Sequence, residues 1–121
     1  MVHFSLMAIT DLEERLITFS VLSIRLAKNI RRSFEGRHLA QQLMRSSTSA
    51  ALNYGEAKGA ESKKDFIHKM RLVLKELRES LVCLKIIKRC DFISQEELLN
   101  EADELVAIFV TSLRTAENKS L

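Results

Sequence analysis

The stretch from Arg45 to Phe66, RSSTSAALNYGEAKGAESKKDF, decides the fold of this chain. It begins with a run of small residues, Ser46 to Ala51, inside a segment that otherwise has helical character. It then turns at Gly59, and a new helix is expected to start at Ser62. Small side chains let two helix backbones approach closely, and serine hydroxyls can bond back to carbonyls of their own helix. We therefore expect close helix–helix contact along this segment.

The composition predicts a single domain of long helices. The chain has 121 residues, of which 46% are hydrophobic, with only three glycines and no proline to interrupt helices. No apolar run reaches the ~20 residues that a bilayer requires. The first ten residues, MVHFSLMAIT, lack the basic start of a signal peptide, so a cytoplasmic location is expected.

The hydrophobic periodicity predicts four helices, at about residues 11–33, 37–58, 63–90 and 95–116. Short turns at Ser33–Gly36, Gly59–Glu61 and Asp91–Ile93 separate them, so domain 1–121 should form an up-down-up-down antiparallel four-helix bundle. Three helices carry a capping pattern, in which a Ser or Thr is followed three residues later by an acidic residue. The predicted caps are Thr10 with Glu13, Ser62 with Asp65, and Ser94 with Glu97.

The first helix has more apolar surface than one core-facing stripe needs. Leu12, Leu16, Phe19, Leu26 and Ile30 share one face, and Ile17, Val21 and Ile24 form a second row beside it. One interpretation is that the second row contacts another subunit. The other is that this is the central helix of a monomeric bundle.

Polar residues run along the second helix in the order Arg45, Ser49, Asn53 and Glu56. Asn53 and Glu56 are three residues apart and therefore within reach of each other. We interpret the row as an interhelix polar network that sets helix register, with a ligand site as the alternative.

Two cysteines, Cys83 and Cys90, lie seven residues apart on the third predicted helix. That spacing places them on one face, ~10 Å apart along the axis. The separation is too great for a disulfide, and reduced, buried thiols are expected instead.

Charge is unevenly distributed along the chain. Residues 63–90 contain nine Lys or Arg and three Asp or Glu, a net charge of +6, whereas residues 91–121 carry −5. The basic helix is a candidate nucleic-acid surface, although a solvated face would look the same in sequence. The candidate residues are Arg71, Lys75, Arg78, Lys85, Lys88 and Arg89, joined by Arg25, Lys28, Arg31 and Arg32 of the first helix. The cluster at the end of the first helix is also explained by the helix dipole.

Recognisable catalytic chemistry is absent from the sequence. The three histidines, His3, His38 and His68, fall on separate segments without metal-ligand spacing. No glycine-rich phosphate loop or nucleophile–base order occurs, so neither an enzyme nor a cofactor or metal is expected.

Three short segments resemble a known family. Residues 45–49 (RSSTS), 53–57 (NYGEA) and 62–67 (SKKDFI) are similar to the bacterial four-helix-bundle proteins encoded by intervening sequences in 23S ribosomal RNA genes. Residues 69–87 (KMRLVLKELRESLVCLKII) are also similar to the third helix of that family, and the resemblance spans about residues 11–115. Ala57 departs from the pattern, since many relatives have glycine there.

The resemblance implies a bundle that assembles into a ring, typically a homopentamer. Related bundles are accessory proteins of diversity-generating retroelements, where they contact a reverse transcriptase and nucleic acid. The family has no agreed catalytic residues. We interpret the positions that match its motif as structural, namely Arg45, Ser49, Asn53, Glu56, Ser62 and Phe66. The alternative function is a protein-interaction scaffold without a nucleic-acid role, in which the acidic fourth helix covers the basic third one.

Overall fold

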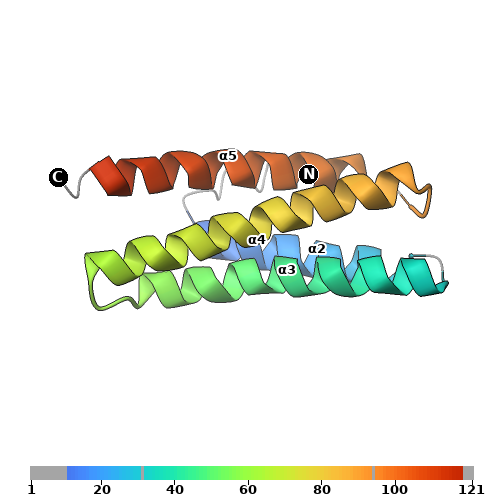
Figure 1. Ribbon diagram of the computed structural model, residues 1–121, viewed down its shortest axis with the longest axis horizontal. Coiled ribbons are helices and arrows are strands. Elements are labelled where there is room, and N and C mark those ends of the chain that lie inside the picture. Colours follow the sequence, from blue (N-terminus) through green and yellow to red (C-terminus); the bar gives the residue numbers. More distant parts are fainter. Residues whose placement is uncertain (1–10, 31, 94, 119–121) are drawn as a thin grey trace.

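The computed structural model describes residues 11–30, 32–93 and 95–118, which form four α-helices joined by short turns. The helices are α2 (Leu12–Lys28), α3 (Phe34–Lys58), α4 (Lys63–Arg89) and α5 (Glu96–Asn118). Within the described ranges there is no β-strand. Successive helices run in opposite directions along one long axis (Figure 1), which confirms the predicted all-α four-helix bundle.

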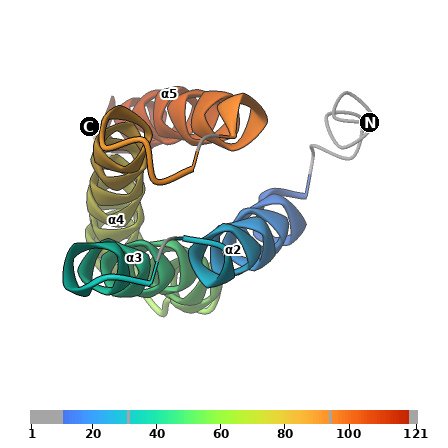
Figure 2. The same ribbon diagram turned by 90° about the vertical axis from the view of Figure 1, so that its right-hand side faces the viewer.

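The four helices do not contact one another equally. Seen end-on, they surround a shared interior in the order α2, α3, α4, α5 (Figure 2). Contact is most extensive between α3 and α4, followed by α2 with α3 and α4 with α5. The pair that would close the bundle, α2 and α5, has much the sparsest contact of these.

The core is aliphatic, as the composition predicts. Its fully buried side chains come from all four helices and include Leu16, Phe19, Leu43, Val73, Leu77, Leu98, Leu105 and Phe109. The half-buried ring of Tyr54 meets Phe109 edge-on, with 5.5 Å between ring centroids. The first of the two apolar rows predicted for the first helix therefore faces the common interior.

The first two helices begin and end differently from the prediction. The N-cap of α2 is Asp11, whose side chain accepts a hydrogen bond from the Glu14 amide at 3.1 Å; the predicted cap, Thr10, lies outside the described residues. The helix ends at Lys28 instead of residue 33. The prediction that Ser33 belongs to a turn and that the next helix starts near residue 37 was wrong. Ser33 is the N-cap of α3 and accepts from the Gly36 amide at 2.9 Å.

The later boundaries agree closely with the sequence patterns. Ser62 caps α4 as predicted, accepting a hydrogen bond from the Asp65 amide at 3.0 Å. The predicted cap of α5, Ser94, lies outside the described residues. Asp91, just after α4, has a positive φ of 59°, a conformation that asparagine and aspartate tolerate better than most side chains.

Small residues bring α3 close to both of its neighbours. The hydroxyl of Ser20 on α2 donates to the carbonyl of Ser47 on α3 at 2.9 Å. On the other side of α3, the hydroxyls of Ser46 and of Ser80 on α4 lie 2.7 Å apart and are fully buried. A hydroxyl can reach across an interface in this way only where the two backbones lie close together. The close approach predicted for the Ser46–Ala51 run is therefore confirmed on two sides.

The second apolar row of α2 is not covered by the helices of its own bundle. Ile17 and Val21 are 41% and 40% exposed, and Ile24 is half-buried. This exposure does not fit a central helix that is buried on two sides within a monomer.

The two cysteines differ in environment. Cys83 is buried, but Cys90 is the exposed C-cap of α4, so the prediction of two buried thiols was half wrong. Both are free thiols. Burial raises the pKa of the Cys83 thiol to about 11, which keeps it protonated and unreactive at neutral pH.

Candidate nucleic-acid interface

The outer face of α4 carries a stripe of exposed cations. Arg71, Lys75, Arg78, Lys85 and Arg89 are all exposed and recur at helical spacing, so they share one side of the helix. Lys88 is also exposed but lies off this stripe. The stripe contains two aliphatic residues, Val82 and Ile86, which are 54% and 43% exposed.

Of these six cations of α4, Arg71 and Lys88 form ion pairs. Arg71 pairs with Glu117 of α5 at 2.7 Å, and Lys88 pairs with Glu96 of α5. Within the described part of the chain, Lys75, Arg78, Lys85 and Arg89 have no acidic partner within ion-pair distance. The middle of the basic stripe therefore remains uncovered by the acidic helix.

Two other acidic residues of α5, Glu101 and Glu104, are engaged by Arg15 of α2. The guanidinium of Arg15 contacts Glu101 through two nitrogens, at 2.6 and 2.8 Å, and it also contacts Glu104. The side chain of Arg15 is 4% exposed, against 22% for Glu101 and 52% for Glu104. The hydrogen bonds to Glu101 raise the pKa of Arg15 above its ordinary value. Arg15 is thus a buried cation that joins α2 and α5, whose mutual contact is much sparser than that of α3 with α2 or α4.

The basic residues of α2 lie near the turn into α3. Arg25, Lys28 and Arg32 are exposed, and none of them has an acidic partner within the described ranges. Arg31, a further predicted contact residue, lies outside the described residues. The predicted nucleic-acid residues therefore fall into two groups, one along α4 and one at the α2–α3 turn.

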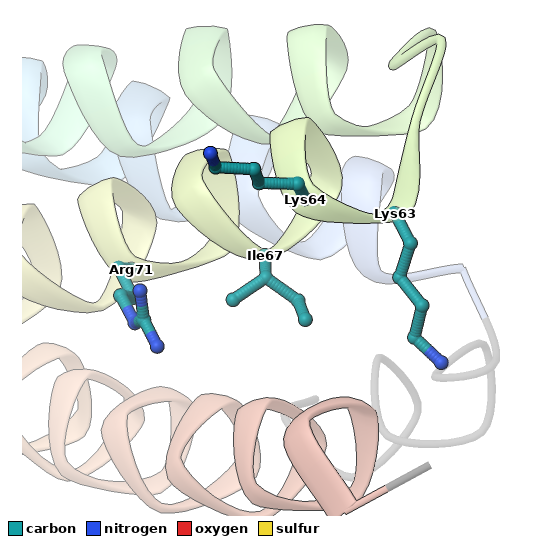
Figure 3. Close-up of a pocket in the computed structure, with 4 residues that line it drawn as sticks. All are labelled: Lys63, Lys64, Ile67 and Arg71. Carbon is teal, nitrogen blue, oxygen red and sulfur yellow. The ribbon is translucent and has the colours of Figure 1, made fainter. Parts of the chain in front are cut away.

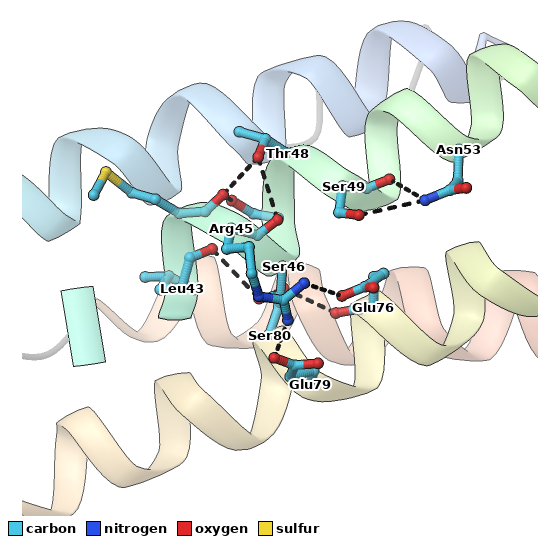
Figure 4. A network of polar contacts seen from close by, with 11 residues as sticks. Leu43, Arg45, Ser46, Thr48, Ser49, Asn53, Glu76, Glu79 and Ser80 are labelled. Atoms are coloured by element: carbon cyan, nitrogen blue, oxygen red, sulfur yellow. Dashed lines mark hydrogen bonds and ion pairs between the residues drawn. The ribbon is translucent and has the colours of Figure 1, made fainter. Parts of the chain in front are cut away.

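The polar row of α3 links that helix to α4 (Figure 4). Arg45 reaches across to two carboxylates, Glu76 at 3.3 Å and Glu79. The hydrogen bond to Glu79 raises the pKa of Arg45, although almost half of the arginine side chain is exposed. Further along, Glu56 pairs with Lys69 of α4 at 2.6 Å. Arg45 and Glu56 are therefore engaged across the α3–α4 boundary.

The expected contact between Asn53 and Glu56 does not form. Asn53 instead donates to the carbonyl of Ser49 at 2.9 Å, within its own helix (Figure 4). Glu56 pairs with Lys69 of α4. The row lies at half-buried and exposed positions, so water can also satisfy it. Phe66 is half-buried and packs against the core.

A basic recess lies at the start of α4. It is lined by Lys63, Lys64, Ile67 and Arg71 (Figure 3). Lys63 and Lys64 point in different directions from the helix, and Arg71 is engaged by Glu117. The three cations do not converge on one point, so this recess is part of a charged surface and not a defined ligand pocket.

An apolar groove lies between α3 and α4 on the outer surface. Leu39 and Cys83 form its floor with Val82 and Ile86, and Arg78 and Glu79 stand at its margin. It combines exposed aliphatic surface with the basic stripe.

Other kinds of site find no support within the described ranges. No group of three or more His, Cys, Asp or Glu residues there is placed to hold a metal ion. His38 and His68 are exposed on different helices, and His3 lies outside these ranges. Among the helices that the structure describes, none is long and apolar enough to cross a bilayer.

Sequence patterns had not singled out Arg15 or its partner Glu101. A signal was present, because both occupy positions on the apolar faces of their helices. Arg15 lies three residues after Leu12 and four before Phe19, and Glu101 has the same spacing from Leu98 and Leu105. Opposite charges at core positions of two helices point to a buried pair.

Comparisons with known proteins identify a family and a similar solved structure. The sequence profile of the 23S rRNA-intervening sequence protein family matches residues 11–111. A crystal structure of a protein of unknown function from the S23 ribosomal protein family of Bacteroides thetaiotaomicron is similar, with 28% identity and a TM-score of 0.76. The similarity covers 84% of this chain and 96% of that one. No protein with a curated description matches the sequence.

Proposed function

The chain belongs to the 23S rRNA-intervening sequence protein family, and we propose that it is a non-enzymatic, cytosolic homo-oligomer that binds nucleic acid through basic surfaces. In this role it either binds RNA or DNA directly or assists a nucleic-acid enzyme such as a reverse transcriptase. The observation that carries the proposal is the uncovered middle of the α4 stripe, formed by Lys75, Arg78 and Lys85.

These three cations are not needed to hold the bundle together. They are exposed on one face of α4, without an acidic partner in the described ranges, while Glu101 and Glu104 of α5 are occupied by Arg15. Unpaired surface cations attract phosphates through a field that does not depend on base sequence. The exposed aliphatic neighbours Val82 and Ile86 are not aromatic, so base stacking is not part of the proposal.

The test compares binding of the purified protein with that of a triple variant, Lys75→Gln, Arg78→Gln and Lys85→Gln. Fluorescence anisotropy with a labelled single-stranded RNA at low salt should give salt-sensitive binding for the natural protein. Loss of about three phosphate contacts should weaken binding at least tenfold and lower the slope of log K against log salt by about two.

A charge-matched control separates this surface from net charge alone. Lys63→Gln, Lys64→Gln and Arg114→Gln remove the same three charges from exposed positions off the middle of the stripe. This control should bind more tightly than the triple variant. Equal binding by the two variants, or no binding by the natural protein at low salt, contradicts the proposal.

We further propose that copies associate through the uncovered apolar row of α2, with a pentameric ring as the expected assembly. Ile17 and Val21 support this because they present aliphatic surface that no helix of the same chain covers. Light scattering at micromolar concentration should give a mass of about five chains of 13.9 kDa each. Val21→Glu should reduce that mass, and Thr18→Glu, an exposed polar position on α2, should not. A monomer for the natural protein would refute this assembly.

A protein-interaction scaffold is the second candidate. The pairs of Arg71 with Glu117 and of Lys88 with Glu96 favour it, because they tie the basic helix to the acidic one at both ends. The groove around Val82 and Ile86 would then be the contact surface. Protein capture that is lost in Val82→Glu, together with no polyanion binding, would support the scaffold over the nucleic-acid proposal.

A further inference from the structure

A small pocket at the α2–α3 turn gathers three cations. It encloses about 200 Å³, between the end of α2 and the start of α3. Three exposed cations, Lys28, Arg32 and Arg37, line it together with four buried residues, Ala27, Ile30, Gly36 and Ala40.

None of the three cations of this pocket, Lys28, Arg32 and Arg37, forms an ion pair within the described part of the chain. Glu35, the acidic residue in the first turn of α3, is exposed and does not line the pocket. The positive charge here is therefore not neutralised by the side chains around it.

The position of two of these cations is unfavourable for the fold itself. Arg37 is the fourth residue of α3, and Arg32 comes just before the cap Ser33. Both lie near the positive end of the helix dipole, which favours anions and disfavours cations. Lys28, in the last turn of α2, is placed where the dipole favours it. Arg32 and Arg37 thus gain nothing from the dipole of α3, but a bound anion would interact well with both and with the helix.

We propose that this pocket binds a phosphate monoester. Two guanidinium groups and one ammonium suit an ion with close to two negative charges and three acceptor oxygens, and arginine can hold phosphate oxygens in pairs. A phosphodiester in the middle of a strand carries a single charge and matches three cations less well. The group can come from the phosphorylated end of a nucleic acid or from a free phosphomonoester. The inference deepens the proposed function, since Lys28 and Arg32 belong to its predicted basic surfaces.

The experiment compares two labelled 12-nucleotide RNAs that are identical except for a 5′-phosphate or a 5′-hydroxyl end. We expect the natural protein to bind the phosphorylated strand with about tenfold higher affinity, because charge-assisted hydrogen bonds to one phosphate contribute a free energy of that order. Arg37→Gln and, separately, Arg32→Gln should remove that preference. Arg114→Gln, an exposed arginine on α5 outside the pocket, should keep it. Circular dichroism melting checks that each variant folds.

In a second experiment, the protein is titrated separately with inorganic phosphate and with ribose 5-phosphate. Binding is monitored through the NMR chemical shifts of backbone amides at the α2–α3 turn. Saturable shifts that are lost in Arg37→Gln, with no binding of either RNA, would support the pocket with a free phosphomonoester as ligand while the proposed function fails. Equal binding of the two RNAs, with no turn-specific shifts, would overturn the pocket and leave nucleic-acid binding standing. Preference for the 5′-phosphate that persists in both arginine variants would also overturn it.

Discussion

Two helix boundaries in this bundle are held by different means. The α3–α4 boundary is long and close, and its centre is a pair of buried neutral hydroxyls, Ser46 and Ser80. The α2–α5 boundary has sparse contact, and there the buried charge of Arg15 meets the carboxylates of Glu101 and Glu104. The first boundary depends on shape spread over many residues, and the second depends on one charge and its partners.

This difference indicates which boundary should lose more stability on a single substitution. Removing one hydroxyl from a closely packed boundary costs little, because neighbouring contacts persist. Removing the less exposed partner, Glu101, leaves the buried charge of Arg15 only with Glu104, which is 52% exposed, and breaking a buried pair costs more than the pair contributes. The region with fewer contacts should therefore show the larger response to a single polar substitution.

The largest effect is expected from Glu101→Gln at the α2–α5 boundary. It takes away the bidentate partner of Arg15, whose side chain is 4% exposed, and should lower the free energy of unfolding by about 3 kcal/mol. Glu104→Gln is the matched control, since Glu104 is 52% exposed, and should cost about 0.5 kcal/mol. Urea unfolding measures both. If the two variants lose similar amounts of unfolding free energy, the buried pair of Arg15 with Glu101 does not stabilise the α2–α5 boundary more than the exposed pair with Glu104.

Two smaller effects, of opposite sign, are expected from the buried serines Ser46 of α3 and Ser23 of α2. Ser46→Ala removes the hydrogen bond to Ser80 and should destabilise the protein by about 1 kcal/mol. Ser23 of α2 is also fully buried, but its hydroxyl has no hydrogen-bond partner among the described residues. Ser23→Ala should therefore be neutral or stabilise by up to about 1 kcal/mol. Thermal and urea unfolding test the sign, and destabilisation by Ser23→Ala would show a missed partner.

The last prediction concerns the reactivity of the two cysteines, which is measured without altering the stability of the protein. Cys83 lies within the α3–α4 boundary, where its thiol contacts the Leu39 carbonyl at 3.4 Å, and its pKa is raised by burial to about 11. At pH 8 a maleimide or disulfide reagent should modify exposed Cys90 at least tenfold faster than Cys83.

The reactivity of Cys83 also tests whether the α2–α5 and α3–α4 boundaries open independently. Glu101→Gln loosens the α2–α5 side, so Cys83 should stay protected under native conditions in that variant. If Cys83 becomes as reactive as Cys90 there, the two boundaries open together and their independence is refuted.

The fold was largely predictable from sequence because its determinants are local and periodic. The seam of α5, from Leu98 to Leu113, and the cap Ser62 follow patterns that need no tertiary information. The missed cap at Ser33 shows the limit of such patterns. A serine followed by an acidic residue and a glycine is also typical of a turn. Only the folded structure, in which α3 begins directly after Ser33, distinguishes a helix cap from a turn.

The candidate site was predictable only as a set of residue types. Helical spacing placed Lys75, Arg78 and Lys85 on one face, but it did not say which cations the acidic helix would neutralise. The sequence suggested that α5 could cover α4, whereas Glu101 and Glu104 of α5 pair with Arg15, and Glu117 and Glu96 pair with Arg71 and Lys88 but not with the middle of the stripe. Arg37 had no place in the prediction, because its position beside Lys28 and Arg32 arises from the folded turn.

For residues 11–30, 32–93 and 95–118, the sequence was enough to predict four helices, their approximate bounds and the small-residue surface at residues 46–51, because each depends on interactions within one or two turns. Tertiary structure alone decided that Ser46 would meet Ser80, and that Arg15 would meet Glu101 across 86 residues of chain. Such pairings depend on helix register and rotation, which are set by the packing of all four helices together.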